Sequence, residues 1–420
     1  MPTQVTTGRG LSPAAAFTGL VDHGLFSEKL PTCFTSEGLS ACLPPALLPV
    51  TTEVNPKKLR KLLADKTHNY MRYSLLRDSN VPRQLGVPHP ESYLAQCLAI
   101  QRLFPTIKRH CSKPHPPVSR IFVRRTAGKR VFQMNYQGQE RFDNTELDLQ
   151  HMTGAAYVAH TDISSCFPSI YTHSIPWALH GKATAKQGRF AFSAGNLLDR
   201  ATQCTQDGQT NGLLIGPHSS NLLAEIILTS VDEKILKRGY SRVVRHIDDY
   251  RFYAKTHEEA ERFLRELSLE LRKFELVLND RKTRILRMPR PLANEWVRQL
   301  NGSRLARGKG RVGIGPPRSL LDLALKLAQE NGTSAVLNYA IKMVPARLYP
   351  RARPLFVRQV VNLALQYPYL ATLLDVHLFQ KHRYDGIETI VREFSDELVV
   401  IGTRRLFSGA MVEIRVRGLR

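Results

Sequence analysis

The chain has 420 residues, a length that allows two or three domains. It carries 60 Lys and Arg residues against 36 Asp and Glu residues, a formal net charge of +24. Lys and Arg gain affinity for phosphates by displacing counterions, and no apolar run approaches the length of a membrane-spanning helix. No basic amphipathic segment stands apart from the rest either, so the composition favours nucleic acid over a membrane surface as the partner.

The amino-terminal part of the chain does not resemble a secretion signal, because no cluster of positive charge precedes an apolar core. Residues 1–56 are rich in Thr, Ser, Gly and Pro, which predicts an irregular arm. The six cysteines are scattered and form no C-x-x-C pair, so we expect reduced thiols and a cytoplasmic protein. His110, Cys111 and His115 have the spacing closest to a zinc site, but they lack a fourth ligand.

Helical patterns follow at 57–66 and 95–107, before a proline-rich break. Beyond Pro316 a leucine-rich helical periodicity continues to about residue 398 and is interrupted by prolines. Helices in pairs with short breaks fit a helical-repeat appendage, although no repeat of fixed period is present.

Two helices are predicted in the central region. Ser219 and Ser220 are placed to cap a helix whose apolar positions begin at Leu222. Thr256, with Glu259 three residues later, makes a capping box for a second helix.

Two adjacent carboxylates, Asp248 and Asp249, lie between two short runs rich in Val, Ile, Phe and Tyr. This pattern predicts a β-hairpin with the pair at its turn, although Asp also favours turns for purely structural reasons. An earlier β-prone run ends in Asp162, which brings a third carboxylate to the end of a neighbouring strand. Three converging carboxylates repel each other unless cations lie among them, so the cluster suits a pair of Mg²⁺ ions.

These elements have a recognisable order. A strand ends at Asp162, a helix follows, the hairpin and the second helix come next, and a last strand is expected at 274–278. The order strand, helix, strand, strand, helix, strand is that of the ferredoxin-like unit, an α+β fold.

Five motifs in chain order resemble those of reverse transcriptases. They are RQLGVPHPESYLAQCLAI (first finger motif), TDISSCFPSIYTHSIPWALHG (motif A), NGLLIGPHSSNLLAEI (motif B), RHIDDYRFYA (x-x-D-D box) and LVLNDRKTRI (motif D). The tract YTHSIPWALHG particularly resembles bacterial abortive-infection and other defence-associated reverse transcriptases, which often carry a helical carboxy-terminal region. The resemblance implies a right-hand polymerase with fingers at 57–156, a ferredoxin-like palm at 157–290 and a helical thumb or repeat region at 291–420.

The resemblance also assigns metal ligands and a proton donor. Asp162 and Asp248 would hold two Mg²⁺ ions, for which Mn²⁺ is an alternative, and the main-chain carbonyl of Ile163 would complete one site. Asp249 would shape and charge the cluster. Lys282 would donate a proton to the leaving pyrophosphate, whereas taken alone it reads as a solvated surface lysine.

Nucleotide-binding residues follow in the same way. The backbone of the turn Ser164, Ser165, Cys166 and Phe167 would cradle the triphosphate. Phe167 falls where the family places a steric gate against the ribose 2′-hydroxyl, with core packing as the alternative. Gly216 would let the backbone approach the nucleotide. Among the basic residues of the fingers, Arg124 is a candidate triphosphate ligand, with a solvated face as the alternative.

Two positions depart from the family pattern. Leu214, Ile215 and Gly216 stand where Pro-Gln-Gly is usual, and His246 stands where Tyr or Phe is common in the x-x-D-D box. Retron tracts and a zinc-bearing maturase tail are absent from the sequence, which favours the defence clade.

The sequence therefore predicts an RNA-directed DNA polymerase of a bacterial anti-phage system that uses dNTPs and a dedicated noncoding RNA. The first alternative is a template-independent, protein-primed DNA polymerase whose DNA product stays covalently attached. The second is a non-catalytic RNA-binding scaffold, and self-association is left open.

Overall fold

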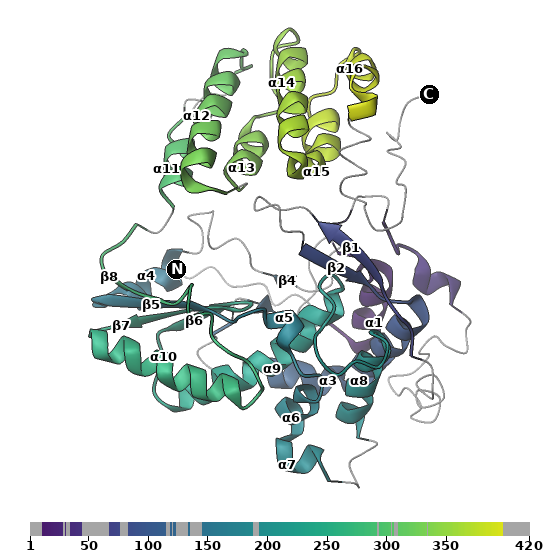
Figure 1. Ribbon diagram of the computed structural model, residues 1–420, viewed down its shortest axis with the longest axis vertical. Helices are drawn as coiled ribbons and strands as arrows, with labels where there is room; N and C mark the ends of the chain where they lie inside the picture. Colours follow the sequence, from purple (N-terminus) through teal and green to yellow (C-terminus); the bar gives the residue numbers. More distant parts are fainter. Residues whose placement is uncertain are drawn as a thin grey trace. The chain divides into compact units, whose positions relative to one another are not determined.

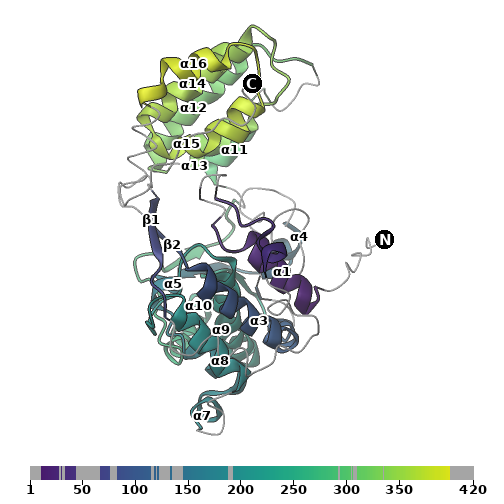
Figure 2. The same ribbon diagram turned by 90° about the vertical axis from the view of Figure 1, so that its right-hand side faces the viewer.

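The computed structural model describes residues 11–27, 30, 34–43, 67–75, 83–114, 118–119, 121–122, 133–134, 145–187, 193–291, 294–303, 305, 310–333 and 335–397. The chain forms two compact units (Figures 1 and 2). Met1–Met71 and Gly86–Arg290 form the first unit, and Arg72–Leu85 and Pro291–Arg420 form the second. The predicted helix at 57–66 and the candidate ligand Arg124 lie outside the described residues. The fingers, palm and thumb boundaries stay predictions.

The first unit contains a four-stranded sheet, which lies at the left of this unit in Figure 1. Its strands are β5 (Tyr157–Asp162), β6 (Val243–His246), β7 (Asp249–Ala254) and β8 (Arg284–Arg287), in the spatial order β6-β7-β5-β8. Each neighbouring pair is antiparallel. This is the ferredoxin-like arrangement, and it confirms the predicted order of elements.

The position of the last strand was predicted wrongly. The strand expected at 274–278 is only a bridge between Ile163 and Leu278, and β8 begins at Arg284. The chain reverses at Glu275, which has a left-handed φ of 63°, and the amide of Leu276 donates to the carbonyl of Leu271. The segment is therefore used to close the preceding helix, and only its end reaches the sheet.

Two helices, α9 (His218–Lys237) and α10 (His257–Arg272), cover one face of the sheet (Figure 1). Phe252 of β7 stacks on Phe263 of α10 with 4.5 Å between ring centroids, and both side chains are buried. The hydroxyl of Thr256 accepts a hydrogen bond from the amide of Glu259 at 3.2 Å, which confirms the predicted cap of α10. The predicted serine cap of α9 is wrong, because Pro217 is the N-cap and both serines lie buried inside the first turn.

Three helices pack beside this layer: α1 (Pro13–His23), α3 (Pro90–Cys111) and α8 (Ala194–Cys204). Helix α3 confirms the pattern seen at 95–107. Helix α1 corrects the prediction of a wholly irregular arm, since an alanine-rich run behind Ser12 and Pro13 starts a helix whose Phe17 and Leu20 are buried. The hydroxyl of Tyr93 in α3 donates to the carbonyl of Leu20, which ties the two helices together.

The remaining described elements before residue 290 are short. They are a 3₁₀ turn (Leu39–Cys42), β1 (Met71–Leu75) paired with β2 (Arg83–Val87), β3 (Ile121–Phe122) paired with β4 (Gln133–Met134), α4 (Thr145–Met152), α5 (Cys166–Ser169), α6 (Ser174–His180) and α7 (Lys182–Ala185).

Beyond residue 290 the second unit is helical, as predicted, and has its own apolar core around Leu320, Leu337 and Phe356. Its described elements are α11 (Glu295–Asn301), α12 (Gly315–Asn331), α13 (Ala335–Met343), α14 (Ala352–Gln366), a 3₁₀ turn (Pro368–Leu370), α15 (Ala371–Leu373), a π-helix (Leu374–Gln380) and α16 (Ile387–Glu393). Within the described ranges, the helices are all too short or too polar to cross a membrane.

Candidate active site

The turn between β6 and β7 presents one of the three predicted carboxylates. His246 pairs with Asp249, so the turn itself consists of Ile247 and Asp248, and Asp249 is the first residue of β7 rather than part of the turn. Ile247 has a left-handed φ of 57°, which is uncommon for a β-branched residue and costs about 1–3 kcal/mol. The surrounding structure must therefore hold this turn in place.

The pairing of β5 with β7 brings the other two carboxylates together. Asp162, the last residue of β5, lies opposite Asp249 in the antiparallel register. The amide of Ile163 donates to the carbonyl of Asp248 at 3.2 Å, which joins the end of β5 to the turn. The structure thus gathers Asp162, Asp248 and Asp249 at one end of the sheet.

The electrostatics of the cluster reflect this crowding. Burial, followed by the nearby charge of Asp162, raises the pKa of Asp248 to about 6. The same two causes raise the pKa of Asp249. Lys282 forms an ion pair with the carboxylate of Asp162, and this hydrogen bond raises the pKa of the lysine.

The cluster fits divalent metal ions. Three carboxylates supply the hard oxygen ligands that Mg²⁺ prefers, and the repulsion among them falls when cations bind. Lys282 is the one ammonium group bonded to Asp162 within the part of the chain that the structure describes, and it partly balances the charge.

The predicted triphosphate cradle follows directly on Asp162 and Ile163. Ser165 has a left-handed φ of 46°, and the short helix α5 begins at Cys166, whose side chain is buried. The amide of Ser164, however, donates to the carbonyl of Val277 at 2.8 Å, so it is already used by the fold. Of the predicted cradle, the amides of Ser165, Cys166 and Phe167 therefore remain as candidates.

Phe167 is half-buried and packs against the edge of the main core. Its carbonyl accepts a hydrogen bond from the amide of Leu213 at 2.8 Å, which ties the motif A turn to the motif B loop. This placement is compatible with both interpretations of the ring, the steric gate and the core contact.

Gly216 is required by the fold itself. Its φ is +144°, and a Cβ at this position would lie 3.1 Å from the carbonyl oxygen of Gly86. The amide of Gly86 in turn donates to the carbonyl of Ile215 at 2.9 Å. The glycine therefore permits a close backbone approach within the first unit, a reason that is independent of any nucleotide.

A row of basic side chains lies next to the carboxylates, and the sequence analysis missed it. His160 of β5 pairs with Arg251 of β7 and with Arg284 of β8, two residues along the strands from Asp162 and Asp249. Residues two apart on a strand share a face, so these side chains lie on the face that α9 and α10 leave open, about 7 Å from the acidic pair. The sequence held a signal for this row: Asp249 and Arg251 are two residues apart in a predicted strand, so their side chains lie on the same face.

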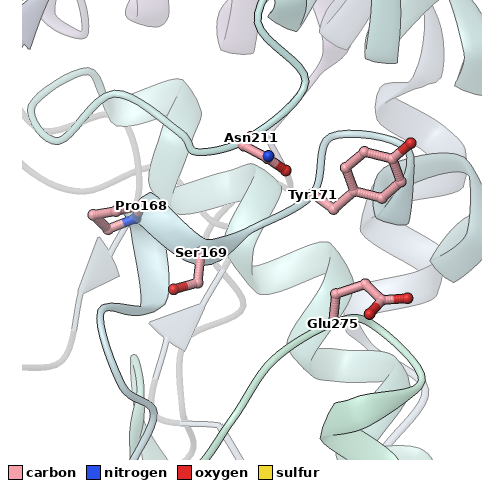
Figure 3. Close-up of a pocket in the computed structure, with 5 residues that line it drawn as sticks. All are labelled: Pro168, Ser169, Tyr171, Asn211 and Glu275. Carbon is pink, nitrogen blue, oxygen red and sulfur yellow. The ribbon is translucent and has the colours of Figure 1, made fainter.

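An open hollow of about 520 Å³ lies beside the motif A turn (Figure 3). It is lined by Pro168, Ser169, Tyr171, Asn211 and Glu275. Tyr171 and Asn211 form a backbone bridge, so the hollow lies where the motif A and motif B segments meet. Asp162, Asp248 and Asp249 do not line it, and the hollow is distinct from the acidic cluster.

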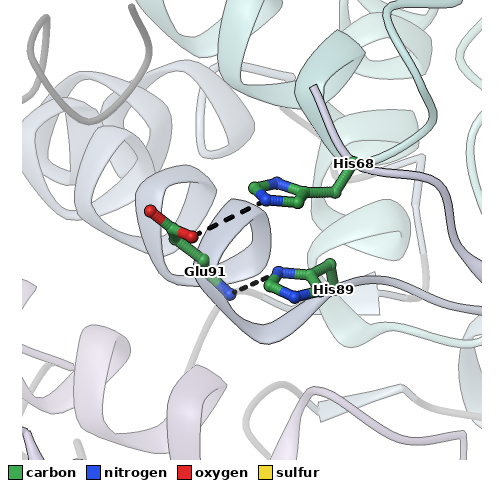
Figure 4. A group of neighbouring side chains, drawn as sticks. All are labelled: His68, His89 and Glu91. Carbon is green, nitrogen blue, oxygen red and sulfur yellow. Dashed lines mark hydrogen bonds and ion pairs between the residues drawn. The ribbon is translucent and has the colours of Figure 1, made fainter. Parts of the chain in front are cut away.

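A second group of possible metal ligands is formed by His68, His89 and Glu91 (Figure 4). The two imidazole rings are stacked 4.0 Å apart at 8°, so their in-plane lone pairs run parallel and do not converge on one point. Nδ1 of His89 already accepts the amide of Glu91 at the start of α3. These side chains form a helix cap and an ion pair, and their geometry does not suit a metal centre.

The weaker zinc pattern at His110 has no support either. Nε2 of His110 lies 2.8 Å from the carbonyl oxygen of Ile226, where the ring bonds to the backbone. His115 lies outside the described residues.

Comparison with protein families identifies the domain that holds the acidic cluster. The family model described as "Reverse transcriptase (RNA-dependent DNA polymerase)" matches residues 96–306, half of the 420-residue chain. The match includes all four strands of the central sheet and the three carboxylates. The right-hand polymerase fold predicted from the motifs is thereby confirmed.

Comparison with solved structures returns telomerases at low similarity. Telomerase from Candida albicans in complex with a TWJ fragment of telomeric RNA is 11% identical, with a TM-score of 0.36 over 84% of this chain and 65% of that one. Apo telomerase from Candida tropicalis, truncated from the C-terminal domain, is 12% identical, with a TM-score of 0.32 over 50% of this chain and 49% of that one. The chain thus spans about half to two thirds of these telomerases, and no conclusion rests on them. A search of curated proteins finds no match.

The raised pKa of Asp248 predicts a stability difference that depends on pH. Ionised Asp248 is disfavoured in the folded state. Its ionisation therefore lowers the free energy of unfolding above pH 6, and this effect disappears below about pH 4. We expect Asp248→Asn, without divalent ions, to raise the free energy of unfolding at pH 8 by about 1–2 kcal/mol, after allowance for solvent screening. Urea unfolding of both proteins at pH 8 and pH 4 measures this.

The exposed Asp322 of α12 provides the control. Asp322→Asn should change stability little at either pH. An Asp248→Asn protein that is less stable than wild type at pH 8 without metal would contradict the electrostatic account of the cluster.

Proposed function

The chain belongs to the reverse transcriptase family and carries the domain of an RNA-directed DNA polymerase, and from this premise we propose that it serves a bacterial anti-phage defence system. The observation that carries the catalytic part is the gathering of Asp162, Asp248 and Asp249 on two paired strands. The motif A tract around Tyr171, which resembles abortive-infection enzymes, supports the defence role.

We propose that Asp162 and Asp248 hold two Mg²⁺ ions, with the carbonyl of Ile163 as a further ligand and Asp249 shaping the field. When bound, such ions activate the primer hydroxyl and neutralise charge on the phosphates. Lys282 would then be able to leave its ion pair with Asp162, because bound cations would balance the charge of that carboxylate. The freed ammonium group protonates or neutralises the leaving pyrophosphate.

The incoming dNTP is proposed to bind between the motif A turn and the motif B loop. The amides of Ser165, Cys166 and Phe167 lie at the start of α5, where helix amides lack intrahelical partners. The hydrogen bond from Leu213 to Phe167 supports a common site for the two segments. Gly216 leaves this part of the loop without a side chain. Arg124 remains the candidate for the triphosphate from the fingers.

Burial lowers the pKa of His160, so the two arginines of the basic row, Arg251 and Arg284, are the charged groups that support a nucleic-acid partner on the open face of the sheet. Phosphate contacts explain affinity but carry no sequence information, and RNA is chosen mainly through shape and unpaired bases. We propose a dedicated noncoding RNA as the template, in the bacterial cytoplasm. The described cysteines are free thiols, in keeping with that compartment.

Two alternatives remain distinct. A template-independent, protein-primed polymerase would use the same carboxylates and leave its DNA attached to a Tyr, Ser or Thr hydroxyl. A non-catalytic RNA-binding scaffold has no need of the acidic cluster, whose repulsion is costly without cations. The presence of all three carboxylates favours an enzyme.

Removal of two carboxylates tests the catalytic assignment. We expect Asp248→Ala with Asp249→Ala to lower incorporation of labelled dNTPs by roughly three orders of magnitude, since metal stabilisation is worth several kcal/mol and ~1.4 kcal/mol is tenfold. The fold should survive, because repelling charges are removed. Circular dichroism checks the fold, and near wild-type incorporation by a folded variant would refute the assignment.

Truncation of the aromatic ring at Phe167 tests the steric gate. Phe167→Val should lower the selectivity for dNTPs over rNTPs by roughly 10- to 100-fold, because a smaller side chain admits the 2′-hydroxyl. Single-nucleotide incorporation kinetics measure both substrates. Phe274 is also half-buried against the same core, so Phe274→Val controls for the loss of a ring. Equal selectivity in the two variants would assign Phe167 to core packing.

The nature of the partner is tested by ultraviolet crosslinking and sequencing from cells. One dominant structured RNA is expected if the template is dedicated. A protease-sensitive and DNase-sensitive shift of the polypeptide on a denaturing gel, without an enriched RNA, would support protein priming instead. Random cellular RNA that is released by salt would contradict a dedicated partner and leave a general polymerase.

A further inference from the structure

Arg245 is completely buried in the first unit and lies two residues before the strained Ile247. Its guanidinium has five N–H donors, and each of them has an acceptor within hydrogen-bond distance. Nε and Nη2 donate to the carboxylate of Asp232 at 2.7–3.1 Å, and Nη1 and Nη2 donate to Glu225 at 2.9 and 3.0 Å. The remaining Nη1 donor reaches the carbonyl of Ile247 at 2.9 Å.

Both acidic partners come from α9 and are themselves buried. Glu225 and Asp232 lie seven residues apart, two turns along the same helix face, so one guanidinium reaches both. Asp232 also accepts the hydroxyl of Tyr250 at 2.9 Å. We call Glu225, Asp232 and Arg245 the buried charge network.

Stability alone does not account for such a network. Buried ion pairs are often no more stabilising than well-packed apolar residues of similar size, because the charges lose their hydration. What the network adds is one directed contact, from Nη1 of Arg245 to the turn that carries Asp248.

That contact is one of two that fix the peptide groups on either side of the Asp248 side chain. The carbonyl of Ile247 accepts from Arg245, and the carbonyl of Asp248 accepts from the amide of Ile163. A backbone in an unfavourable φ region persists only when its surroundings hold it, and these two bonds come from opposite sides of the turn.

We propose that the buried charge network is a positioning device that holds the Ile247–Asp248 turn in its strained form, so that Asp248 faces Asp162 before metal binds. The network also connects the turn to α9, the helix that begins directly after Gly216 and Pro217. The metal-binding part of this inference rests on the proposed function, whereas the part about the turn does not.

Isosteric variants test the proposal in the full-length protein. Glu225→Gln and Asp232→Asn keep the size of the side chain and weaken the hold on Arg245, and Arg245→Lys keeps the charge but cannot span three acceptors. Glu270→Gln is the matched control. Glu270 is a buried acid on α10, and the ion pairs that the structure gives it are with Arg238 and Lys273 and not with the turn.

The first measurement is amide hydrogen exchange at residues 246–249 without metal or nucleotide. We expect exchange to be about tenfold faster in the network variants and unchanged in Glu270→Gln, even if that control lowers the melting temperature. Unchanged exchange at the turn in folded Glu225→Gln and Asp232→Asn would overturn the proposal. If Arg245→Lys does not fold, these two variants and Tyr250→Phe, which removes one bond to Asp232, still decide the matter.

The second measurement is Mn²⁺ binding by electron paramagnetic resonance, with the Mg²⁺ concentration that gives half-maximal incorporation. The dissociation constant of Mn²⁺ and the half-maximal Mg²⁺ concentration should both rise about tenfold in the network variants. Both should stay at the wild-type value in Glu270→Gln. Faster exchange with unchanged metal binding would overturn the link to the metal site. A wild-type protein with no polymerase activity, but with the expected exchange pattern, would refute the proposed function and leave the positioning role standing.

Discussion

The antiparallel pairing of β5 with β7 is the constraint on which the site depends. It places Asp162 directly opposite Asp249, and like charges in such a pair destabilise a sheet. The hairpin turn then adds Asp248, whose pKa is raised by burial and by Asp162. Lys282 relieves part of this repulsion through its ion pair. Three repelling carboxylates at one end of a sheet are stabilised when cations bind among them. This property connects the architecture with metal-dependent chemistry.

The two faces of the sheet carry different side chains. The face toward α9 and α10 carries aromatic residues such as Phe252 and the buried Arg245, and it is closed to solvent. The open face carries Asp162 and Asp249 and, two residues along, the basic row with Arg251. Because side chains alternate along each strand, one register sets the positions of the proposed metal ligands, of the buried charge network on the other face and of the arginines on the open face.

At two positions assigned from the resemblance, packing also explains the residue type. Gly216 permits the approach of Gly86, and the side chain of Phe167 packs half-buried against the main core. A family motif therefore records both the needs of the fold and those of the substrate, and the residue type does not separate them. Ser164 illustrates the opposite case, since its amide is bonded to Val277 and is not available to the proposed triphosphate site.

The sequence by itself determined the features that depend on near neighbours: the cap of α10 at Thr256, the period of α3, the hairpin around Asp248 and the strand that ends in Asp162. The closely spaced motifs identified the resemblance to the family and the three carboxylates. Only the tertiary structure decided which distant residues meet, because strand register and helix contacts are set by packing across many residues. The last strand thus lies at 284–287 instead of 274–278, and the N-terminal helix α1 forms where its apolar face meets α3. Arg245 likewise finds its partners 13 and 20 residues away on α9, a contact that no local pattern encodes.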